Sequence, residues 1–346
     1  MTDLTPSPEL YLHDQGRQPQ RGELLEVAPD LFWLRIVSPL APMGGVNVWV
    51  IRDGVGWAIV DTGFTDTDTT EQWDFMIKHA LPGGVTKIIC THHHPDHIGQ
   101  VDMLQNRFDA PLYMSAVEWH QTRNFTGLNA ESAAQMAAHL EMLGIDEAGA
   151  AQIRALGDAR TDPIIIPETF HDLRAGETLR IGDHDWRIAT GGGHSPAPAL
   201  LYNDALQVGI VGDQILTRIT PHIGTEQNAP LGDPLGDYFA FLDGMRDTPA
   251  DMLILPGHGP ALRNVGRRVK EIAAHHHDRL DALRLALREG PKRPADVLFV
   301  LFGRKLSGFQ LMMGLTEAHA HLNHLVTLGE AGRSLIKDQF IYSSNL

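Results

Sequence analysis

The first three quarters of the chain carry short apolar runs that alternate with polar segments containing Gly and Pro. Three early runs, at 31–37, 46–51 and 57–60, have the length and spacing of adjacent strands. Later strands are predicted at 87–90, 179–189, 199–202, 206–211 and 252–255. Helical stretches are predicted at 69–80, at 116–157 and after a Pro- and Gly-rich loop at 220–236. Because strands and helices alternate, the pattern predicts an α/β fold.

The pattern changes after residue 262. Three helices are predicted at 264–289, 294–302 and 308–328, and the first places one face at 272, 276, 280, 283 and 287. Phe340, Ile341 and Tyr342 predict a small terminal hairpin. Three helices and a short β wing outline a small, mostly helical, winged-helix-like domain. We therefore divide the chain into an N-terminal arm (1–25), a main domain (26–262) and a C-terminal domain (263–346).

Composition narrows the class of protein. The chain has 346 residues, 43% of them hydrophobic, which is enough for a sizeable core. Its formal net charge of −15 disfavours nucleic-acid partners, because their binding depends on Lys and Arg. The single cysteine, Cys90, is predicted to be buried and suits a reducing compartment. With neither a secretory signal nor a membrane-spanning run in the sequence, we expect a cytoplasmic protein without membrane contact.

A dense group of candidate metal ligands follows the strand predicted at 87–90: His92, His94, Asp96 and His97. Side chains two residues apart in an extended segment point the same way, so His92 and His94 can bind one ion. The turn that follows can direct Asp96 and His97 at a second ion. Imidazole with few carboxylates is typical of zinc and argues against calcium or magnesium.

Three further candidates, His194, Asp213 and His258, each follow a predicted strand and stand beside a glycine. The ends of strands are where α/β proteins gather functional groups, and glycine lets the backbone approach an ion closely. Together with the 92–97 block this gives five histidines and two aspartates. Such a set suffices for two divalent metal ions with one shared carboxylate and open positions for water.

These pieces, with Asp61-Thr62-Gly63, resemble the metallo-beta-lactamase superfamily and, within it, the glyoxalase II-like hydrolases. The matching segments are the 92–97 block, 193–195, 212–213 and 257–259, and the resemblance covers about residues 25–262. It implies a four-layer αββα sandwich with a catalytic main domain.

The resemblance also implies a role for each ligand. His92, His94 and His194 would bind the first metal. Asp96, His97 and His258 would bind the second. Asp213 would bridge the two ions, and Asp61 would steady the ligand loop without touching a metal.

The expected chemistry is hydrolysis. A water on such metals has a pKa of about 7, so a bridging hydroxide is present at neutral pH, and Asp96 could orient it as the catalytic residue. The expected substrate is an ester, thioester, lactone or related small electrophile. We find no obvious Arg/Lys pair for a glutathione or coenzyme A group, which favours a small or apolar acyl group. Zn²⁺ is expected, although Fe, Mn and Ni also suit imidazole sites.

The alternative function is a metal-dependent endoribonuclease or phosphodiesterase of the same superfamily, because a nuclease branch shares the 92–97 block and carries a winged-helix tail. The acidic charge and the lack of a Lys/Arg stripe at 308–328 argue against it. The short stretch between Asp213 and His258 leaves no room for the inserted domain of the processing nucleases. An iron-dependent oxygenase ranks lower still, because both halves of the site are complete.

The remaining candidates are less specific. His93 is expected to point away from the metals. His222 and Tyr202 are candidates for the substrate pocket, with packing as the alternative for both. The triplet at 275–277 does not share one helix face, so a solvated or half-buried surface is favoured over a metal site. The expected partner is a small-molecule substrate, and the C-terminal helices are expected to pack on the core as a pocket wall or to form a homodimer contact.

Overall fold

The computed structural model describes residues 13–38, 44–123, 129–159 and 163–345. Residues 24–172 contribute a seven-stranded sheet in which the strands follow chain order. Its strands are β1 (Leu24–Ala28), β2 (Leu31–Ile36), β3 (Val46–Asp53), β4 (Gly56–Val60), β5 (Val85–Ile89), β6 (Leu112–Met114) and β7 (His171–Asp172). Neighbours are antiparallel from β1 to β4 and parallel from β4 to β7. β1 begins inside the predicted arm, whose residues 1–12 lie outside the described residues.

A second, five-stranded sheet has the order β12-β11-β10-β9-β8. Its strands are β8 (Thr178–Ile181), β9 (His184–Thr190), β10 (Ala199–Asn203), β11 (Val208–Gly212) and β12 (Leu253–Pro256). The single strand predicted at 179–189 is wrong: the chain reverses between Ile181 and His184, and β8 pairs with β9 as a hairpin. Gly182 makes this turn possible, since its φ of 55° is a conformation that other residues adopt at a cost.

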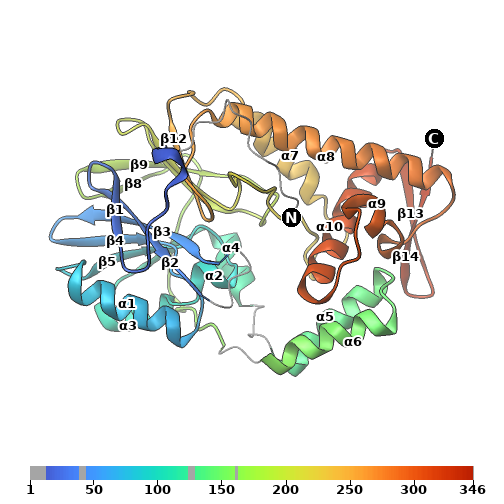
Figure 1. Cartoon of the computed structure of the whole chain (residues 1–346), viewed down its shortest axis with the longest axis horizontal. Coiled ribbons are helices and arrows are strands. Elements are labelled where there is room, and N and C mark those ends of the chain that lie inside the picture. The colour runs from blue at the N-terminus through green and yellow to red at the C-terminus, as the bar shows by residue number, and fades with distance from the viewer. Residues whose placement is uncertain (1–12, 39–43, 124–128, 160–162, 346) are drawn as a thin grey trace.

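The two sheets pack face to face and helices cover their outer faces, which confirms the four-layer αββα arrangement (Figure 1). The alternation along β3 shows how the sequence specifies this. Trp49 packs between the sheets with Trp186, whereas Val48 and Val50 pack toward α1 (Thr67–His79) and α3 (Val101–Phe108). On the other side, α7 (Pro234–Met245) and α8 (Val265–Arg288) share a core with β10, β11 and β12.

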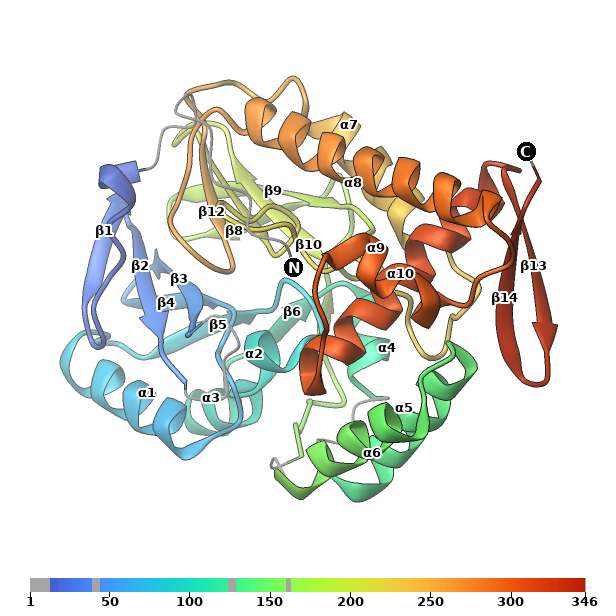
Figure 2. The ribbon, with the colours of Figure 1, turned by 45° about the vertical axis from the view of Figure 1, so that its right-hand side comes forward.

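Between β6 and β7 of the first sheet the chain forms a helical excursion. It consists of α4 (Ala116–Thr122), α5 (Ala130–Met142) and α6 (Glu147–Leu156). The short α2 (Pro95–Ile98) lies between β5 and α3 and carries part of the 92–97 block. Helices α5 and α6 contact the C-terminal helix α10 (Gly308–Thr327), so this excursion joins the C-terminal region (Figure 2).

The C-terminal region contains α8, the one-turn helix η3 (Pro294–Val297), α9 (Leu298–Phe302), α10 and the hairpin β13 (Ala331–Ile336) and β14 (Gln339–Ser344). The predicted hairpin is confirmed, as is the buried face of α8, which includes His276. In α10, polar side chains are buried together with the apolar ones. Glu317, His319 and His321 are fully buried, because α5, α6, α7, α8 and α9 all contact this helix.

One continuous apolar core joins the C-terminal helices to the second sheet. Ile254 of β12, Leu280 of α8 and Leu322 of α10 belong to the same buried cluster. The C-terminal helices therefore pack on the main domain as the sequence predicts. Among the described residues, none of the helices combines the length and hydropathy needed to cross a membrane.

Candidate metal centre

The seven candidate ligands of the sequence analysis converge at one edge of the two facing sheets. His92 and His94 follow β5, and Asp96 and His97 lie on α2. The other three follow β9, β11 and β12 in turn: His194, Asp213 and His258. Five of the seven side chains are buried, and His94 and Asp96 are half-buried. Strand ends of both sheets thus bring together residues that are up to 166 positions apart in the sequence.

Three imidazoles form the first group. The distance from His92 Nε2 to His94 Nδ1 is 3.0 Å, that from His94 Nδ1 to His194 Nε2 is 2.9 Å, and that from His92 Nε2 to His194 Nε2 is 3.2 Å. Nitrogens bound to one zinc ion at about 2.0–2.1 Å lie roughly this far apart. The three nitrogens therefore form a triangle suited to one ion.

The second group combines carboxylates with imidazoles. Asp96 Oδ2 lies 3.1 Å from His258 Nε2 and 3.7 Å from His97 Nε2. Asp213 stands between the groups: its Oδ1 is 3.7 Å from His97 Nε2, and its Oδ2 is 3.4 Å from His258 Nε2 and 3.6 Å from His194 Nε2. Asp213 is thus within reach of an ion in either group.

The residues fit a divalent metal by an independent criterion. His97 Nε2, His258 Nε2 and Asp213 Oδ1 are buried, and despite their close neighbours none of them makes a hydrogen bond of suitable geometry among the described residues. Buried polar atoms are normally paired, so three such atoms at one point indicate a position built for a cation. Gly257 leaves the space: a Cβ there would stand 2.2 Å from Asp213 Oδ1 and 2.9 Å from His97 Cε1.

The electrostatics of the two groups differ. Burial, reinforced by the neighbouring imidazoles, holds the pKa of His92 and of His94 well below the usual range, so both rings are neutral as metal ligands require. Burial also acts to lower the pKa of His258, but Asp213 and Asp96 outweigh it and raise that pKa to about 10. The second group therefore favours positive charge.

Four of the ligand imidazoles have a partner for their other nitrogen, and in His92 it is Thr91 Oγ1, 2.9 Å from Nδ1. His97 Nδ1 is 2.8 Å from Asp61 Oδ2, His194 Nδ1 donates to the carbonyl of His222 at 2.9 Å, and His258 Nδ1 donates to the carbonyl of Gly45 at 2.8 Å. Such bonds fix the tautomer and leave the second nitrogen for a metal. Among the described residues, no interaction joins Asp61 to another candidate ligand. This agrees with a supporting position behind His97.

One supporting residue was missed from the sequence. Glu118, in α4, is fully buried and its Oε2 lies 2.6 Å from His93 Nδ1, while its Oε1 accepts from the backbone of Ala197 at 2.7 Å. It thereby joins the 92–97 loop to the 194–198 loop. The His93 ring contacts Glu118. The two residues are 25 positions apart, so no local sequence pattern predicts their contact.

The two residues suggested for a substrate pocket have other contacts. The Tyr202 hydroxyl lies 3.1 Å from Met245 Sδ, and burial raises the pKa of Tyr202 to about 12. The His222 ring points to α10, where its Nε2 is 3.2 Å from Thr316 Oγ1. Both sets of contacts describe packing, which was the alternative for each.

The histidine triplet at 275–277 differs partly from its prediction. His276 is fully buried, and its Nδ1 is 3.1 Å from His321 Nε2, close to Glu317. These three residues are near enough to hold an ion, but Arg279 pairs with Glu317 and already balances its charge. A divalent cation there would be buried without net negative charge to offset it, so the ion-pair network accounts for the cluster.

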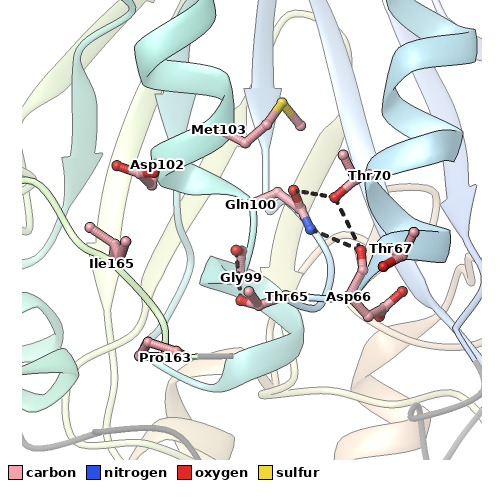
Figure 3. Close-up of a pocket in the computed structure, with 10 residues that line it drawn as sticks. All are labelled: Thr65, Asp66, Thr67, Thr70, Gly99, Gln100, Asp102, Met103, Pro163 and Ile165. Atoms are coloured by element: carbon pink, nitrogen blue, oxygen red, sulfur yellow. Dashed lines mark hydrogen bonds between the residues drawn. The ribbon is translucent and has the colours of Figure 1, made fainter. Parts of the chain in front are cut away.

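Two cavities lie among the described residues near the strand ends. The larger, about 300 Å³, is lined by Thr65, Asp66, Thr70, Gln100 and Asp102 among others, and includes none of the seven candidate ligands (Figure 3). The smaller, about 140 Å³, is lined by Gly193 and Ser195, which flank His194. Its lining also carries three carboxylates: Glu226, Asp233 and Asp237.

Comparison with known proteins places this site in a family. Residues 41–258 match the metallo-beta-lactamase superfamily, and residues 280–342 match a family described as the C-terminal domain of metallo-beta-lactamase-like proteins. An uncharacterized protein of Aquifex aeolicus is 29% identical over 223 residues, covering 64% of this chain and 88% of that protein. A hydroxyacylglutathione hydrolase of Nitrosomonas europaea is 29% identical over 82 residues, covering 24% of this chain and 29% of that enzyme.

Solved structures agree. A beta-lactamase domain protein from Burkholderia ambifaria superposes with a TM-score of 0.86 at 31% identity, covering 99% of this chain and 100% of that one. A metallo-beta-lactamase family protein from Thermus thermophilus has a TM-score of 0.76 at 26% identity, covering 92% of this chain and 100% of that one. Three findings lead to one conclusion: the matches to family models, the fold and the clustered ligands. The chain belongs to the metallo-beta-lactamase superfamily of metal-dependent hydrolases.

Proposed function

We propose that this protein is a dinuclear, zinc-dependent hydrolase of small acyl substrates: esters, thioesters or lactones. The observation that carries the proposal is the position of Asp213 between the two ligand groups, within 3.7 Å of His97, His194 and His258. A carboxylate in that position can be shared by two ions, which is the arrangement of two-metal hydrolytic sites. The partial match to a hydroxyacylglutathione hydrolase supports an acyl substrate.

Different residues of the chain have different roles in this proposed reaction. When bound, two divalent metals supply a water of lowered pKa and polarise the oxygen of the substrate. His92, His94 and His194 hold the first position, and Asp96, His97 and His258 hold the second. Asp96 is half-buried, so its carboxylate can also accept a proton from the attacking water and orient it.

The smaller cavity supports a small substrate. Its volume of about 140 Å³ is below the roughly 300–1,000 Å³ of common ligand pockets, so it suits a short acyl group beside His194. Glu226, Asp233 and Asp237 in its wall repel a polyanion. An RNA substrate is therefore disfavoured in comparison with a neutral ester or lactone.

An activity panel tests the proposal. Zinc-loaded protein is assayed on thioesters, aryl esters, lactones and a fluorescent single-stranded RNA, with Asp96→Asn as the inactive reference. Turnover of an acyl substrate that Asp96→Asn loses supports the proposal, and the panel then narrows the acyl group. Cleavage of RNA alone, equally dependent on Asp96, would establish the nuclease alternative instead.

A homodimer through the C-terminal helices is also proposed. Phe299 of α9 and Leu285 of α8 are 71% and 63% exposed on two helices that contact each other, and a dimer formed there would remove both side chains from water. Light scattering on the wild type and on Phe299→Asp tests this, since a dimer formed by these helices would dissociate in the variant.

A further inference from the structure

The loop between β11 and α7 is attached to the C-terminal helices at both ends. Near its start, buried Arg268 of α8 donates to the carbonyls of Leu216 at 2.9 Å and of Ile219 at 2.8 Å. Farther along, the backbone N–H of Thr225 donates to the carbonyl of Thr316 in α10 at 3.2 Å. The loop therefore takes its shape from helices that lie more than 40 residues later in the chain.

Between these attachments lies His222, whose main chain and side chain face different partners. Its carbonyl accepts from Nδ1 of His194, a candidate ligand of the first metal position. Its ring Nε2 lies 3.2 Å from Thr316 Oγ1, and its Nδ1 lies 3.7 Å from Glu317 Oε2. His222 therefore contacts α10 through its ring and His194 through its carbonyl.

The α10 side of this contact is buried, and its polar groups have partners. Glu317 is fully buried and pairs with Arg279 of α8, and the Thr316 hydroxyl also lies 3.1 Å from the carbonyl of Met313. Gly224 leaves room for this contact: a Cβ there would stand 2.2 Å from His222 Nε2 and 2.8 Å from Thr316 Oγ1. The ring is thus packed closely against Gly224 and against two residues of α10, Thr316 and Glu317.

We infer that Thr316 and Glu317 of α10 are positioning residues for the first metal position, acting through His222 on His194. This inference rests on the proposed function, because it concerns the same metal centre. It gives the C-terminal region a part in the chemistry: without α10 the His194 ring loses the support that fixes its tautomer. Bonds of this kind, behind a ligand, typically change metal affinity by about 10–100-fold when removed.

The test measures metal affinity rather than turnover. Wild type, Thr316→Val, Thr316→Ser and Glu317→Gln are equilibrated in zinc buffers of graded free concentration, and bound zinc is counted by elemental analysis. The wild type is expected to bind two ions. In Thr316→Val and Glu317→Gln one of the two should require roughly tenfold more free zinc, while the other is unchanged, and Thr316→Ser should restore the wild-type curve.

Two further variants separate positioning from general destabilisation. Tyr342→Phe removes a buried hydrogen bond to Asn323 in the same C-terminal region without touching His222, and should leave both zinc affinities unchanged. Gly224→Ala would place a methyl group against both His222 Nε2 and Thr316 Oγ1, and should weaken binding of the same single ion. If Glu317→Gln does not fold, the comparison of Thr316→Val with Thr316→Ser tests the inference by itself.

The outcomes are distinct. Two-ion binding by the wild type with an unchanged Thr316→Val curve overturns the inference and leaves the proposed function intact. A wild type that binds no zinc in any buffer overturns both. Loss of one ion in Thr316→Val and Gly224→Ala, with Tyr342→Phe unaffected, is the result that supports the inference.

Discussion

Asp61 Oδ2 lies 2.8 Å from His97 Nδ1, and both residues are buried behind the candidate metal centre. Asp61 follows β4 with a φ of 64°, and it also accepts from the backbone N–H of Thr91 at 2.8 Å. The Asp61 carboxylate therefore fixes the backbone at Thr91, where the ligand loop begins, and also fixes the tautomer of His97. The first prediction follows from this pair.

Replacement of Asp61 by Asn should lower zinc affinity and hydrolytic activity by about 10–100-fold, because the amide cannot hold His97 Nδ1–H as the carboxylate does. Elemental analysis after dialysis and initial rates measure both effects. Asp66→Ala is the control: Asp66 caps α1 by accepting from Thr69, so its loss should cost about 1 kcal/mol of stability without affecting metal. Full zinc retention in Asp61→Asn would contradict the prediction.

Gly257→Ala should abolish binding of at least one metal. The added Cβ would stand 2.2 Å from Asp213 Oδ1, so the shared carboxylate or the loop must move. Gly244→Ala provides a matched control, because nothing lies within 4 Å of a Cβ there and Ala is favoured within α7 by roughly 1 kcal/mol. Zinc counting and thermal unfolding of the two variants check the pair; equal metal content in both would refute the steric argument.

Glu118→Gln should destabilise the protein by about 1.5–3 kcal/mol, since it removes charge from buried hydrogen bonds to His93 and Ala197. Denaturant unfolding measures the loss. Glu141→Gln is the comparison: Glu141 pairs with Arg154 where the two side chains are 46% and 39% exposed, and solvent-accessible pairs contribute about 0–1 kcal/mol. A loss at Glu118 no larger than at Glu141 would show that the two loops hold together without it.

Acid should destabilise the protein before its carboxylates titrate. Burial lowers the pKa of His321 to about 4 and that of His319 to about 3. The folded chain keeps these imidazoles neutral, whereas the unfolded chain protonates them below about pH 6.5. The unfolded state then binds more protons, so stability falls as the pH decreases from about 6.5 toward 4.

Each such imidazole contributes up to about 1.4 kcal/mol per pH unit in this window. Denaturant unfolding of metal-free protein at pH 7, 6 and 5 measures the slope, and His319→Gln should make it shallower. An identical slope in that variant would exclude His319 from the effect.

Metal removal should lower the apparent stability. Ions that bind only the folded state stabilise it by about 2.7 kcal/mol at a hundredfold excess over the dissociation constant. Thermal unfolding with and without a chelator, followed by zinc addition, should show a reversible shift. The Asp96→Asn and His258→Asn variants should show a smaller shift, and a chelator without effect on the wild type would contradict the metal centre.

Much of the fold and of the candidate centre is predictable from local sequence. The alternation along β3 assigns Trp49 and Val50 to opposite faces, which is enough to predict a sheet buried on both sides. Likewise His92 and His94 share a direction because of their spacing, and Gly212 and Gly257 mark close approaches of the backbone. These features depend on residues that are neighbours in the chain.

Other features depend on contacts that no spacing encodes. The polar residues of α10 predict an exposed face, but Glu317, His319 and His321 are buried, because several helices surround α10 and partners such as Arg279 satisfy its charge. The sequence pattern does not predict the hairpin at Gly182 for a similar reason. A single glycine is compatible with one long strand or with two short ones, and only the pairing of β8 with β9 shows that there are two.

The sequence by itself therefore determined the layer pattern, the ligand types and their places at strand ends. The family resemblance already implied the grouping of the ligands around Asp213, and folding brings those side chains together. Only the tertiary structure decided that Glu118 and Thr316 support the loops around them. The physical reason is range. Periodicity and turn chemistry act over a few residues, whereas the orientation of a ligand depends on packing and hydrogen bonds between segments that folding alone brings together.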